Sequence, residues 1–445
     1  MTEKFVDRRP VIQAAVVIHP EFPGETRLRD PEARLLEAVG LAEALDLEVR
    51  AAEIARVRRV TPATLFGSGR VDEIGVLVES VEADLVVIDD ALSPVQQRNL
   101  EKAWKAKVVD RTGLILEIFA RRARTREGKL QVELARLEYE RSRLVRTWTH
   151  LERQRGGLGK TGGPGETQIE LDRRIIADKI VRLKAELEEV RRTRTLHRAA
   201  RKRVPFPTVA LVGYTNAGKS TLFNRLTGAD ALAKDMLFAT LDPTLRTVRL
   251  PKGRPAIISD TVGFISDLPH ELVESFRATL EEVGEADVIL HVRDVADPDG
   301  ESHARDVETV LSQIPVVEGR RQVLLEVWNK IDLLPPEERA PVEARALRRG
   351  DAGGPPAVAV SAVSGEGIEA LRAMIADLVD DAPEVETQLP PGDGEALAWL
   401  YQNGRVTDRE DAEDGSMRVV VRLDAQALGR FERLFPEARL QHAAQ

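Results

Sequence analysis

The stretch TVALVGYTNAGKST, residues 208–221, decides the fold of the part of the chain that contains it. A valine-rich run leads into a loop in which Gly213, Gly218, Lys219 and Ser220 match the pattern G-x-x-x-x-G-K-[ST], and an apolar-periodic segment follows. Glycines allow backbone N–H groups to turn inward around phosphate groups, and the N-terminus of the following helix adds partial positive charge. The stretch therefore predicts a strand, a phosphate-binding loop and a helix inside an α/β domain.

The polar side chains of such a loop have expected roles. Lys219 is expected to contact the β- and γ-phosphates, and the Ser220 hydroxyl to ligate Mg²⁺. Downstream, DTVG (260–263) ends the strand-like run AIISD. This position lets Asp260 hold Mg²⁺ through water and directs the N–H of Gly263 to the γ-phosphate. These residues predict a nucleoside triphosphatase.

Two further segments identify the base as guanine. NKID (329–332) follows the run QVLLEVW, and the Asp332 carboxylate can accept hydrogen bonds from guanine N1–H and its exocyclic amine, which adenine lacks. SAVSG (361–365) follows AVAV and would supply a backbone N–H to guanine O6. The four segments, each after an expected strand, predict a GTPase domain with a mostly parallel sheet and helices on both faces.

The segment DMLFATLDPTLRTV (235–248) contains two candidates for a second magnesium ligand, Thr240 and Thr244. A threonine in this place ties a loop to the γ-phosphate through the metal, and hydrolysis releases that loop. Many GTPases carry glutamine directly after the DxxG glycine to orient the attacking water, but this sequence has Phe264 there. We therefore expect slow intrinsic hydrolysis and assign no general base. The catalytic candidates are Lys219, Thr240 and Gly263.

The net charge of −9 hides an asymmetry along the chain. Residues 121–203 contain 24 Lys and Arg against 12 Asp and Glu, a net of +12, so the rest of the chain carries −21. Such a balance fits a segment that faces a polyanion, and it fits a pair of solvated arginine-rich helices equally.

The basic segment predicts an antiparallel helical hairpin, because apolar residues recur at every third or fourth position in two stretches. Each apolar stripe is too narrow to be stable alone, so the two helices are expected to pack together. A capping box of Thr167 and Glu170 is expected to start the second helix, and RAARKRVPFP (198–207) is expected to be a linker. The stripe residues are Leu130, Leu134, Leu137, Leu144, Trp148 and Leu151, then Ile176, Ile180, Leu183, Leu187 and Val190.

Between the two helices lies RGGLGKTGGPGETQIELDRR (155–174), with an expected tip loop over residues 155–168. Its GKT is not a second phosphate-binding loop, because the first glycine of the pattern would fall on Gln154 and a charged helix precedes it. Glycine backbone takes little room and tolerates any turn, which suits a narrow space lined by RNA. The RNA-binding candidates are Arg155, Gly156, Gly157, Lys160, Gly163, Gly165, Arg173 and Arg174.

The first part of the chain alternates strand-like runs at 11–19 and 83–90 with helical stretches at 31–45 and 93–105. This alternation predicts a small α/β domain with parallel strands. Within it, LFGSGRVDEIGVLVES (65–80) predicts a tight turn followed by a helix.

The end of the chain predicts a small α/β domain. LPPGDG (389–394) marks a break, and MRVVVRLD (417–424) is an expected strand accompanied by one or two helices. The predicted domains are 1–118, an α/β domain; 119–203, the basic hairpin; 204–382, the GTPase domain; and 383–445, the C-terminal α/β domain.

Composition and the N-terminal sequence indicate the cellular compartment. The chain has no cysteine, which excludes disulfides and cysteine-ligated metals and fits a reducing compartment. The N-terminus MTEKFVDRRP lacks the apolar region of a signal peptide, and no run approaches ~18 apolar residues. We expect a cytoplasmic protein without a membrane span, acting as a monomer.

The motifs GYTNAGKS, FATLDPT, DTVGF and NKID, together with GGPGETQIELDRR, resemble the HflX family of ribosome-associated GTPases. The resemblance covers nearly the whole chain, and its specific signal is the pattern GPGETQxExDRR at residues 163–174. Two departures are present: the tip loop is KTGGPGE, where the family commonly has a basic residue before GPGE, and Val363 stands where many GTPases place a lysine against the base.

The resemblance implies GTP/GDP and Mg²⁺ as cofactors and favours Thr240 over Thr244 as the second magnesium ligand beside Ser220. It also implies binding to ribosomal RNA of the large ribosomal subunit, ribosome-stimulated GTP hydrolysis, and splitting or rescue of stalled ribosomes, especially under stress. Secondary ATP hydrolysis stays open. The nucleotide-binding candidates are Gly213, Tyr214, Thr215, Asn216, Ala217, Gly218, Lys219, Ser220, Thr221, Phe238, Ala239, Thr240, Leu241, Asp242, Asp260, Thr261, Val262, Gly263, Asn329, Lys330, Asp332, Ser361, Ala362 and Val363.

Two other functions stay open on the sequence. The chain could be a ribosome-assembly GTPase that binds immature subunits without splitting ribosomes. Alternatively, the hairpin could be a protein-interaction coiled coil switched by the GTPase domain, without RNA contact. Binding that is insensitive to salt would favour the second alternative, since contacts to phosphates weaken with salt.

Overall fold

The computed structural model describes most of the chain, and its contacts divide the chain into two compact units. The larger unit comprises Met1–Val248 and Ala256–Ile368, and the smaller comprises Arg249–Pro255 and Glu369–Gln445. The described residues are 13–23, 30–154, 164–201, 206–228, 237–238, 240–241, 244–251, 255–266, 282–314, 322–379, 384–412, 414–423 and 425–442.

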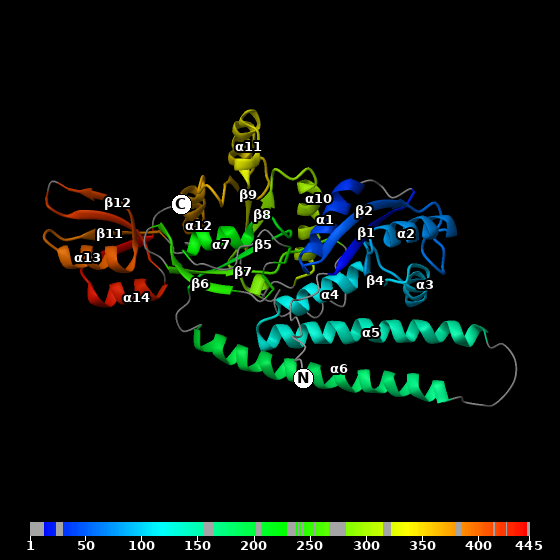
Figure 1. The fold of residues 1–445 in the computed structure, drawn as a ribbon. Coiled ribbons are helices and arrows are strands. Elements are labelled where there is room, and N and C mark those ends of the chain that lie inside the picture. The colour runs from blue at the N-terminus through cyan, green and yellow to red at the C-terminus, as the bar shows by residue number, and fades with distance from the viewer. Residues whose placement is uncertain are drawn as a thin grey trace, which may run out of the picture. The chain divides into compact units, whose positions relative to one another are not determined.

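The larger unit begins with an α/β domain, as the sequence predicts (Figure 1). Its four strands form one parallel sheet in the order β2-β1-β3-β4. Two of these strands, β2 and β4, were not predicted from the sequence. The elements are β1 (Ala14–Glu21), α1 (Pro31–Glu43), β2 (Glu48–Arg56), α2 (Ser68–Ser80), β3 (Leu85–Ile88), α3 (Pro94–Trp104), β4 (Lys107–Asp110) and α4 (Arg111–Arg122).

Helices cover both faces of this sheet at its inner strands, β1 and β3, so that successive residues, which point to opposite sides, are nearly all buried. On one side Val17 and Val87 share a core with α1 and α4, including Ile115 and Phe119. On the other side Ile18 and Ile88 pack with residues of α2 and α3 such as Ile74 and Trp104. The continuous Val and Ile runs in the sequence thus follow from helices on both faces.

The basic segment forms the predicted hairpin of two long helices, α5 (Arg126–Gln154) and α6 (Pro164–Arg201), which lie side by side in Figure 1. An apolar stripe from each helix meets in one core that contains Leu130, Leu134, Leu137, Ile180, Leu183 and Leu187, with Ile176 and Val190 against it. Lys184 on α6 pairs with the buried carboxylate of Glu138 on α5 at 2.9 Å. The side chains of Leu144, Trp148 and Leu151 lie outside the described residues.

Two predicted ends of α6 are wrong. The helix begins at Pro164, so Thr167 is its fourth residue and not the residue before the helix; proline at the first helical position has a backbone φ preset for the helix. Residues 164–168 of the predicted tip loop therefore belong to the helix. At the other end the helix continues to Arg201, through the first residues of the predicted linker, because RAAR lacks any residue that disfavours helix.

The hairpin is fastened to the first domain through Asp110, the last residue of β4. One carboxylate oxygen accepts hydrogen bonds from the Gly113 N–H at 2.8 Å and the Tyr139 hydroxyl at 2.5 Å. The other accepts from the Leu92 N–H at 3.2 Å and pairs with the Arg143 guanidinium. Tyr139 and Arg143 lie one turn apart on α5, so Asp110 fixes the middle of that helix against the domain.

The remainder of the larger unit is built around a six-stranded sheet of order β10-β9-β8-β5-β7-β6. The pairings β10–β9, β9–β8, β8–β5 and β5–β7 are parallel. The predicted P-loop GTPase fold class is confirmed. The elements are β5 (Thr208–Gly213), α7 (Lys219–Thr227), β6 (Thr244–Arg249), β7 (Pro255–Asp260), β8 (Val288–Asp294), α10 (Gly300–Ser312), β9 (Val323–Asn329), η2 (Ile331–Leu333), α11 (Pro336–Arg348) and β10 (Ala357–Ala359).

The smaller unit contains an antiparallel sheet of order β12-β13-β11-β14 with α13 and α14 in a βαββαβ succession. Leu389, Val421 and Phe431 form part of its separate core. The predicted break at LPPGDG lies inside this unit, between β11 and α13, because Leu389 ends a strand of the same sheet. The elements are α12 (Ile368–Leu378), β11 (Glu384–Leu389), α13 (Gly394–Asn403), β12 (Arg405–Asp411), β13 (Met417–Arg422), α14 (Ala425–Leu434) and β14 (Arg439–His442).

Candidate nucleotide site

The predicted phosphate-binding loop joins β5 to α7, and two of its glycines admit no side chain. Gly213 has φ +155°, and a Cβ there would lie 2.2 Å from the backbone oxygen of Val292 on β8. Gly218, with φ +92°, would place a Cβ 2.2 Å from the Asn329 side-chain nitrogen. The loop thus passes closely over the ends of β8 and β9, where only glycine fits at these two positions.

Lys219, the first residue of α7, is buried at the centre of this loop. Its Nζ donates a hydrogen bond to the backbone oxygen of Tyr214 at 2.7 Å. Burial lowers the pKa of Lys219 to about 8, although the nearby Asp260 carboxylate opposes the shift. A phosphate anion beside Nζ would supply the negative charge that burial makes valuable.

Three oxygen-bearing side chains converge beside Lys219. The Ser220 and Thr240 hydroxyls lie 2.8 Å apart, and they donate to the same Asp260 oxygen at 2.8 and 2.7 Å. The other oxygen of Asp260, Oδ1, is buried and has no hydrogen-bond partner among the described residues. Burial raises the pKa of Asp260 against the opposing hydrogen bonds from Thr240 and Ser220.

This set of donors fits Mg²⁺, which prefers hard oxygen ligands and keeps few protein contacts beside phosphates. A cation would also satisfy the buried Oδ1 of Asp260. In the described part of the chain, no group of three or more His, Cys, Asp or Glu could hold a metal ion by itself. Hydroxyls and phosphate oxygens would therefore be needed to complete the coordination.

The structure separates the two threonine candidates. Thr240 lies at the convergence point, whereas Thr244 is the first residue of β6 and makes no contact with Ser220 or Asp260 among the hydrogen bonds of the described residues. Phe238 and Leu241, the described neighbours of Thr240 in the sequence, are buried. Ala239 and Asp242 lie outside the described residues.

The base-binding segments are tied to the phosphate loop by Asn329, which is 2% exposed. Its Nδ2 donates to the backbone oxygen of Ala217 at 2.8 Å, and its Oδ1 accepts from the N–H of Ala362 at 3.0 Å. Arg225 on α7 adds a hydrogen bond to the backbone oxygen of Ala362 at 3.1 Å. Asn329 therefore joins three segments that are far apart in sequence.

The remaining candidates at this end lie around Asn329. Lys330 has φ +68° and pairs with Asp294 at 2.8 Å. Asp332 lies on η2, and its backbone oxygen accepts from Arg339 at 2.6 Å. Ser361 is buried and its hydroxyl accepts from the Ser364 N–H at 3.0 Å, while Val363 is 70% exposed.

The DTVG segment lies directly against the phosphate loop. The Thr215 N–H donates to the Phe264 backbone oxygen at 2.7 Å, and the Phe264 N–H donates to Gly213 at 3.1 Å. A Cβ on Gly263 would come within 3.0 Å of both Lys219 Nζ and Thr215 Cγ2. The Phe264 ring is 2% exposed, so the residue at the usual glutamine position is part of the core.

Comparison with known proteins covers nearly the whole chain. Family models match residues 32–120 (GTP-binding GTPase N-terminal), 122–201 (GTP-binding GTPase Middle Region), 208–330 (50S ribosome-binding GTPase) and 346–443 (HflX C-terminal domain). A GTPase HflX of Magnetococcus marinus is 53% identical over 406 residues, which cover 91% of each chain. This chain belongs to the HflX family of GTPases. The Escherichia coli GTPase HflX is 43% identical over 418 residues, covering 94% of this chain and 95% of that relative.

Among solved structures, a GTP-binding protein from Sulfolobus solfataricus in complex with GDP matches with a TM-score of 0.45 and 23% identity. The match covers 83% of this chain and 99% of that one. Membership of the HflX family confirms the resemblance that the motifs indicated, and the chain is a GTPase.

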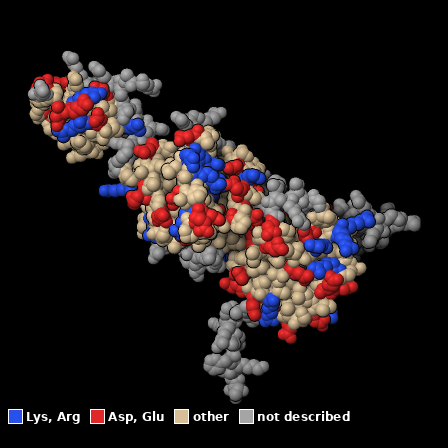
Figure 2. Space-filling model, turned by 90° about the horizontal axis from the view of Figure 1, so that it is seen from above, with Lys and Arg blue, Asp and Glu red and all other residues tan. Residues whose placement is uncertain are grey.

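Three RNA-binding candidates of this HflX GTPase lie among the described residues of α6. Arg173 and Arg174 are exposed on α6, and Gly165 lies in the first turn of that helix. Arg155, Gly156, Gly157, Lys160 and Gly163 lie outside the described residues. On the face drawn in Figure 2, basic and acidic side chains are interspersed.

Residues of the first domain also reach the GTPase site, which the motifs did not indicate. The Tyr214 hydroxyl donates to Glu37 on α1 at 2.8 Å and accepts from the Ser266 N–H at 3.0 Å. Arg111, at the start of α4, is 4% exposed and reaches the same Ser266. In the sequence, the one feature that could have indicated these contacts is the charged pair Asp110 and Arg111 at the end of β4.

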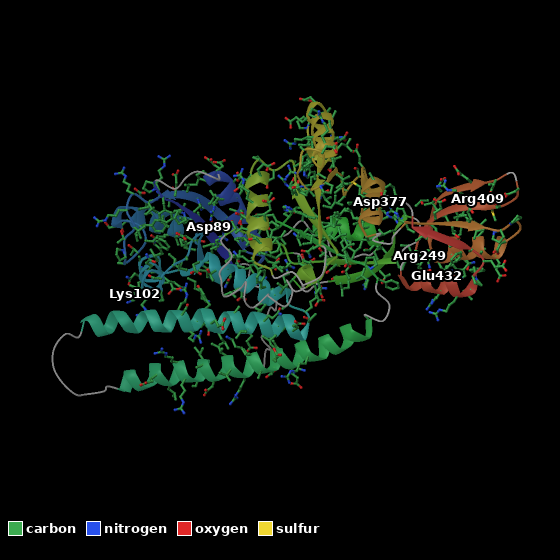
Figure 3. All side chains as sticks on the ribbon, turned by 180° about the vertical axis from the view of Figure 1, so that it is seen from behind. Asp89, Lys102, Arg249, Asp377, Arg409 and Glu432 are labelled. Atoms are coloured by element: carbon green, nitrogen blue, oxygen red, sulfur yellow. The ribbon has the colours of Figure 1, made fainter. Side chains whose placement is uncertain are left out.

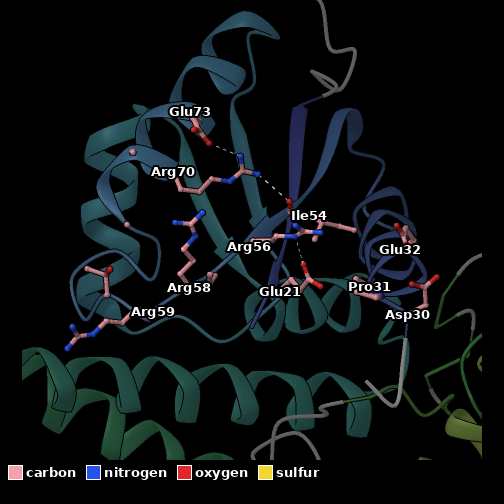
Figure 4. A pocket seen from close by; sticks show the side chains of 14 residues that line it. Glu21, Asp30, Pro31, Glu32, Ile54, Arg56, Arg58, Arg59, Arg70 and Glu73 are labelled. Atoms are coloured by element: carbon pink, nitrogen blue, oxygen red, sulfur yellow. Dashed lines mark hydrogen bonds and ion pairs between the residues drawn. The ribbon is translucent and has the colours of Figure 1, made fainter. Parts of the chain in front are cut away.

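A hollow of about 1010 Å³ lies at the carboxyl edge of the first sheet (Figure 4). Arg56 pairs with Glu21 at 3.0 Å, and Arg70 pairs with Glu73 at 2.8 Å, so its charges are largely balanced within the wall. As predicted, Gly67 stands in the turn that precedes α2. No helix in the described ranges is long and apolar enough to cross a membrane.

Proposed function

We propose that this HflX GTPase binds the large ribosomal subunit through its basic hairpin and, in the GTP state, splits or rescues stalled ribosomes in the cytoplasm, especially under stress. Ribosome binding would stimulate GTP hydrolysis. The protein would act as a monomer. The observation that carries the proposal is a basic segment, residues 121–203 with a net charge of +12, whose hairpin is anchored by Asp110 to a domain that also contacts the GTPase site.

The hairpin suits insertion between RNA strands. Its two helices share an apolar core, so the arm is stiff, while Arg173 and Arg174 are exposed near its end. A helix of the length of α5, 29 residues, extends roughly 40 Å at 1.5 Å per residue. The family models, described as a GTP-binding GTPase middle region and a 50S ribosome-binding GTPase, support this placement.

Nucleotide binding would use the groups that the structure brings together. Backbone N–H groups of the phosphate-binding loop would contact the phosphates, with Lys219 on the β- and γ-phosphates. The Asp332 carboxylate would accept from guanine, and Asn329 would keep the base and phosphate segments in register. Ser220 and Thr240 would hold Mg²⁺, with Asp260 through water; bound Mg²⁺ neutralises charge on the transferred phosphoryl group.

Hydrolysis in the free protein would be slow, since Phe264 is buried and cannot orient water. The Gly263 N–H would contact the γ-phosphate, and Thr240 would link the loop before β6 to that phosphate. A group that positions the water would come from the ribosome-bound state. This explains why turnover is expected to rise on binding.

The experiment that tests the proposal is steady-state GTP turnover with and without purified large ribosomal subunits, with small subunits as the control. We expect stimulation of at least tenfold by large subunits alone, and its absence would refute the proposal. Deleting residues 156–167 should abolish ribosome splitting while GTP binding stays intact.

Charge-reversal variants inside and outside the hairpin test its role. Arg173→Glu and Arg174→Glu together should weaken subunit binding and lower its salt slope, because each lost phosphate contact removes about one unit of slope. Arg98→Glu, exposed on α3, changes charge outside the hairpin and should bind normally. Preference for immature subunits would favour an assembly role, and binding that resists salt and ribonuclease would favour a protein-interaction role.

A further inference from the structure

The first α/β domain contacts both loops that frame the GTPase centre. On the Thr240 side, the ring of Phe119 on α4 meets the ring of Phe238 edge-on, with centroids 4.7 Å apart and an interplanar angle of 84°. Both rings are almost fully buried, at 1% and 2% exposure. Leu237 lies against Gly40 on α1, where an added Cβ would come within 3.3 Å of the Leu237 Cδ1.

Phe238 occupies an unfavourable backbone conformation. Its φ is +54°, in the left-handed region that bulky residues rarely adopt. Such residues persist where the surrounding structure holds them, and they occur often at functional loops. Here the surrounding structure includes Phe119 of the first domain. Thr240 stands two residues later, so the packing of Phe238 helps to set where its hydroxyl lies.

On the DTVG side, Arg111 makes the corresponding contacts. One of its terminal nitrogens donates to the backbone oxygen of Ser266 at 3.2 Å and to its hydroxyl at 3.1 Å. Arg111 also pairs with Glu37, which accepts from the Tyr214 hydroxyl of the phosphate loop at 2.8 Å. Tyr214 and Ser266 are thus held together and to the first domain.

Arg111 is itself rigidly anchored. It pairs with Asp89, labelled in Figure 3, at the end of β3, and Asp89 pairs with His19 of β1 at 2.8 Å. Burial alone would raise the pKa of Asp89, but Arg111 and His19 hold it below its ordinary value. The guanidinium is therefore held between the carboxylates of Asp89 and Glu37 and the loop at Ser266.

We propose that Phe119 and Arg111 are positioning residues for GTP hydrolysis: the first α/β domain holds the Thr240 loop and the DTVG loop in the arrangement that brings Thr240, Ser220 and Asp260 together. Neither side chain touches the reacting atoms. Without these contacts Phe238 would relax from its strained conformation, and Thr240 would leave the convergence point for much of the time. GDP binding depends on the phosphate loop and base segments and would be largely unaffected.

The first test compares two identical substitutions in the same domain. Phe119→Leu removes the edge contact to Phe238, whereas Phe66→Leu removes an equally buried ring from the core on the other face of the sheet. Single-turnover GTP hydrolysis is measured without ribosomes, together with GDP affinity. We expect Phe119→Leu to lower the hydrolysis rate about five- to tenfold with the Kd for GDP within about twofold, and Phe66→Leu to retain the parent rate.

The second test addresses the DTVG loop with smaller changes that the fold should tolerate. Ser266→Ala removes the hydroxyl that Arg111 and Tyr214 contact, and Ser266→Thr keeps it. Hydrolysis should fall several-fold in the first variant and be restored in the second, with KM for GTP little changed. A parent rate in both Phe119→Leu and Ser266→Ala would overturn the proposal. Equal losses in Phe119→Leu and Phe66→Leu would also overturn it.

Discussion

Replacing Asn329 by alanine is the sharpest test of how the nucleotide site is assembled. The Asn329 side chain is buried and joins two segments, donating to the Ala217 backbone oxygen at 2.8 Å and accepting from the Ala362 N–H at 3.0 Å. Alanine removes both hydrogen bonds and supplies no replacement. The phosphate loop and SAVSG then lose their common support.

The magnitude follows from those two bonds. Each contributes about 0.5–1.5 kcal/mol, and a buried partner left without a hydrogen bond costs about 1–3 kcal/mol. Because water can enter part of the opened site, we expect a net loss of about 2–4 kcal/mol. In the free variant the two segments can relax. Nucleotide binding must bring them together again, so most of this free energy appears as weaker nucleotide binding. The corresponding rise in Kd is about 30-fold to about 700-fold.

The assay is titration of a fluorescent GDP analogue at fixed Mg²⁺. Asn99→Ala is a matched control, since Asn99 donates one hydrogen bond to the backbone oxygen of Ala63 in the first domain, away from the site. Asn329→Asp separates the two bonds, because it keeps the acceptor for Ala362 and loses the donor to Ala217. A Kd within twofold of the parent for Asn329→Ala would refute the reasoning.

Three further outcomes are expected. Burial, aided by Arg293, lowers the pKa of His291 to about 4 from 6.5, so the unfolded chain binds more protons between these values. Stability to urea should therefore fall by about 3 kcal/mol from pH 6.5 to pH 4, and an unchanged slope in His291→Leu would contradict this origin. Leu183→Ala should cost about 2–4 kcal/mol and speed proteolysis within the hairpin, whereas Val181→Ala, at a 68% exposed position, should match the parent. Asp332→Asn should weaken GTP binding at least about 100-fold and improve binding of xanthosine triphosphate in competition titrations; unchanged GTP affinity would contradict guanine recognition by this carboxylate.

The parts of the structure that the sequence predicted are those with local or periodic signals. Gly213 and Gly218 predict a loop, and the structure has room for no side chain at either position. The apolar stripes predicted for the hairpin form the core that contains Leu134 and Leu183. The start of α6 was misjudged since Thr167 and Glu170 form a capping pattern, while Pro164 is equally suited to the first turn.

The parts that could not be predicted depend on distant partners. Arg111 belongs to none of the sequence motifs, although it is buried among Asp89, Glu37 and Ser266. Strands such as β12, with the sequence RVTDRED, were missed because charged residues on an exposed antiparallel strand give no hydrophobic alternation.

Asp110 and Arg111 are joined by one peptide bond, yet they belong to different interfaces. Asp110 binds Tyr139 and Arg143 of the hairpin, and Arg111 binds Ser266 beside the GTPase centre. A backbone shift that accommodates a change at one residue displaces the other, so this dipeptide has little mutational tolerance. In a library randomised at both positions, we expect fewer functional double variants than the product of the two single-position frequencies gives. The double variants that survive should carry compensating changes in both α5 and the loop at Ser266.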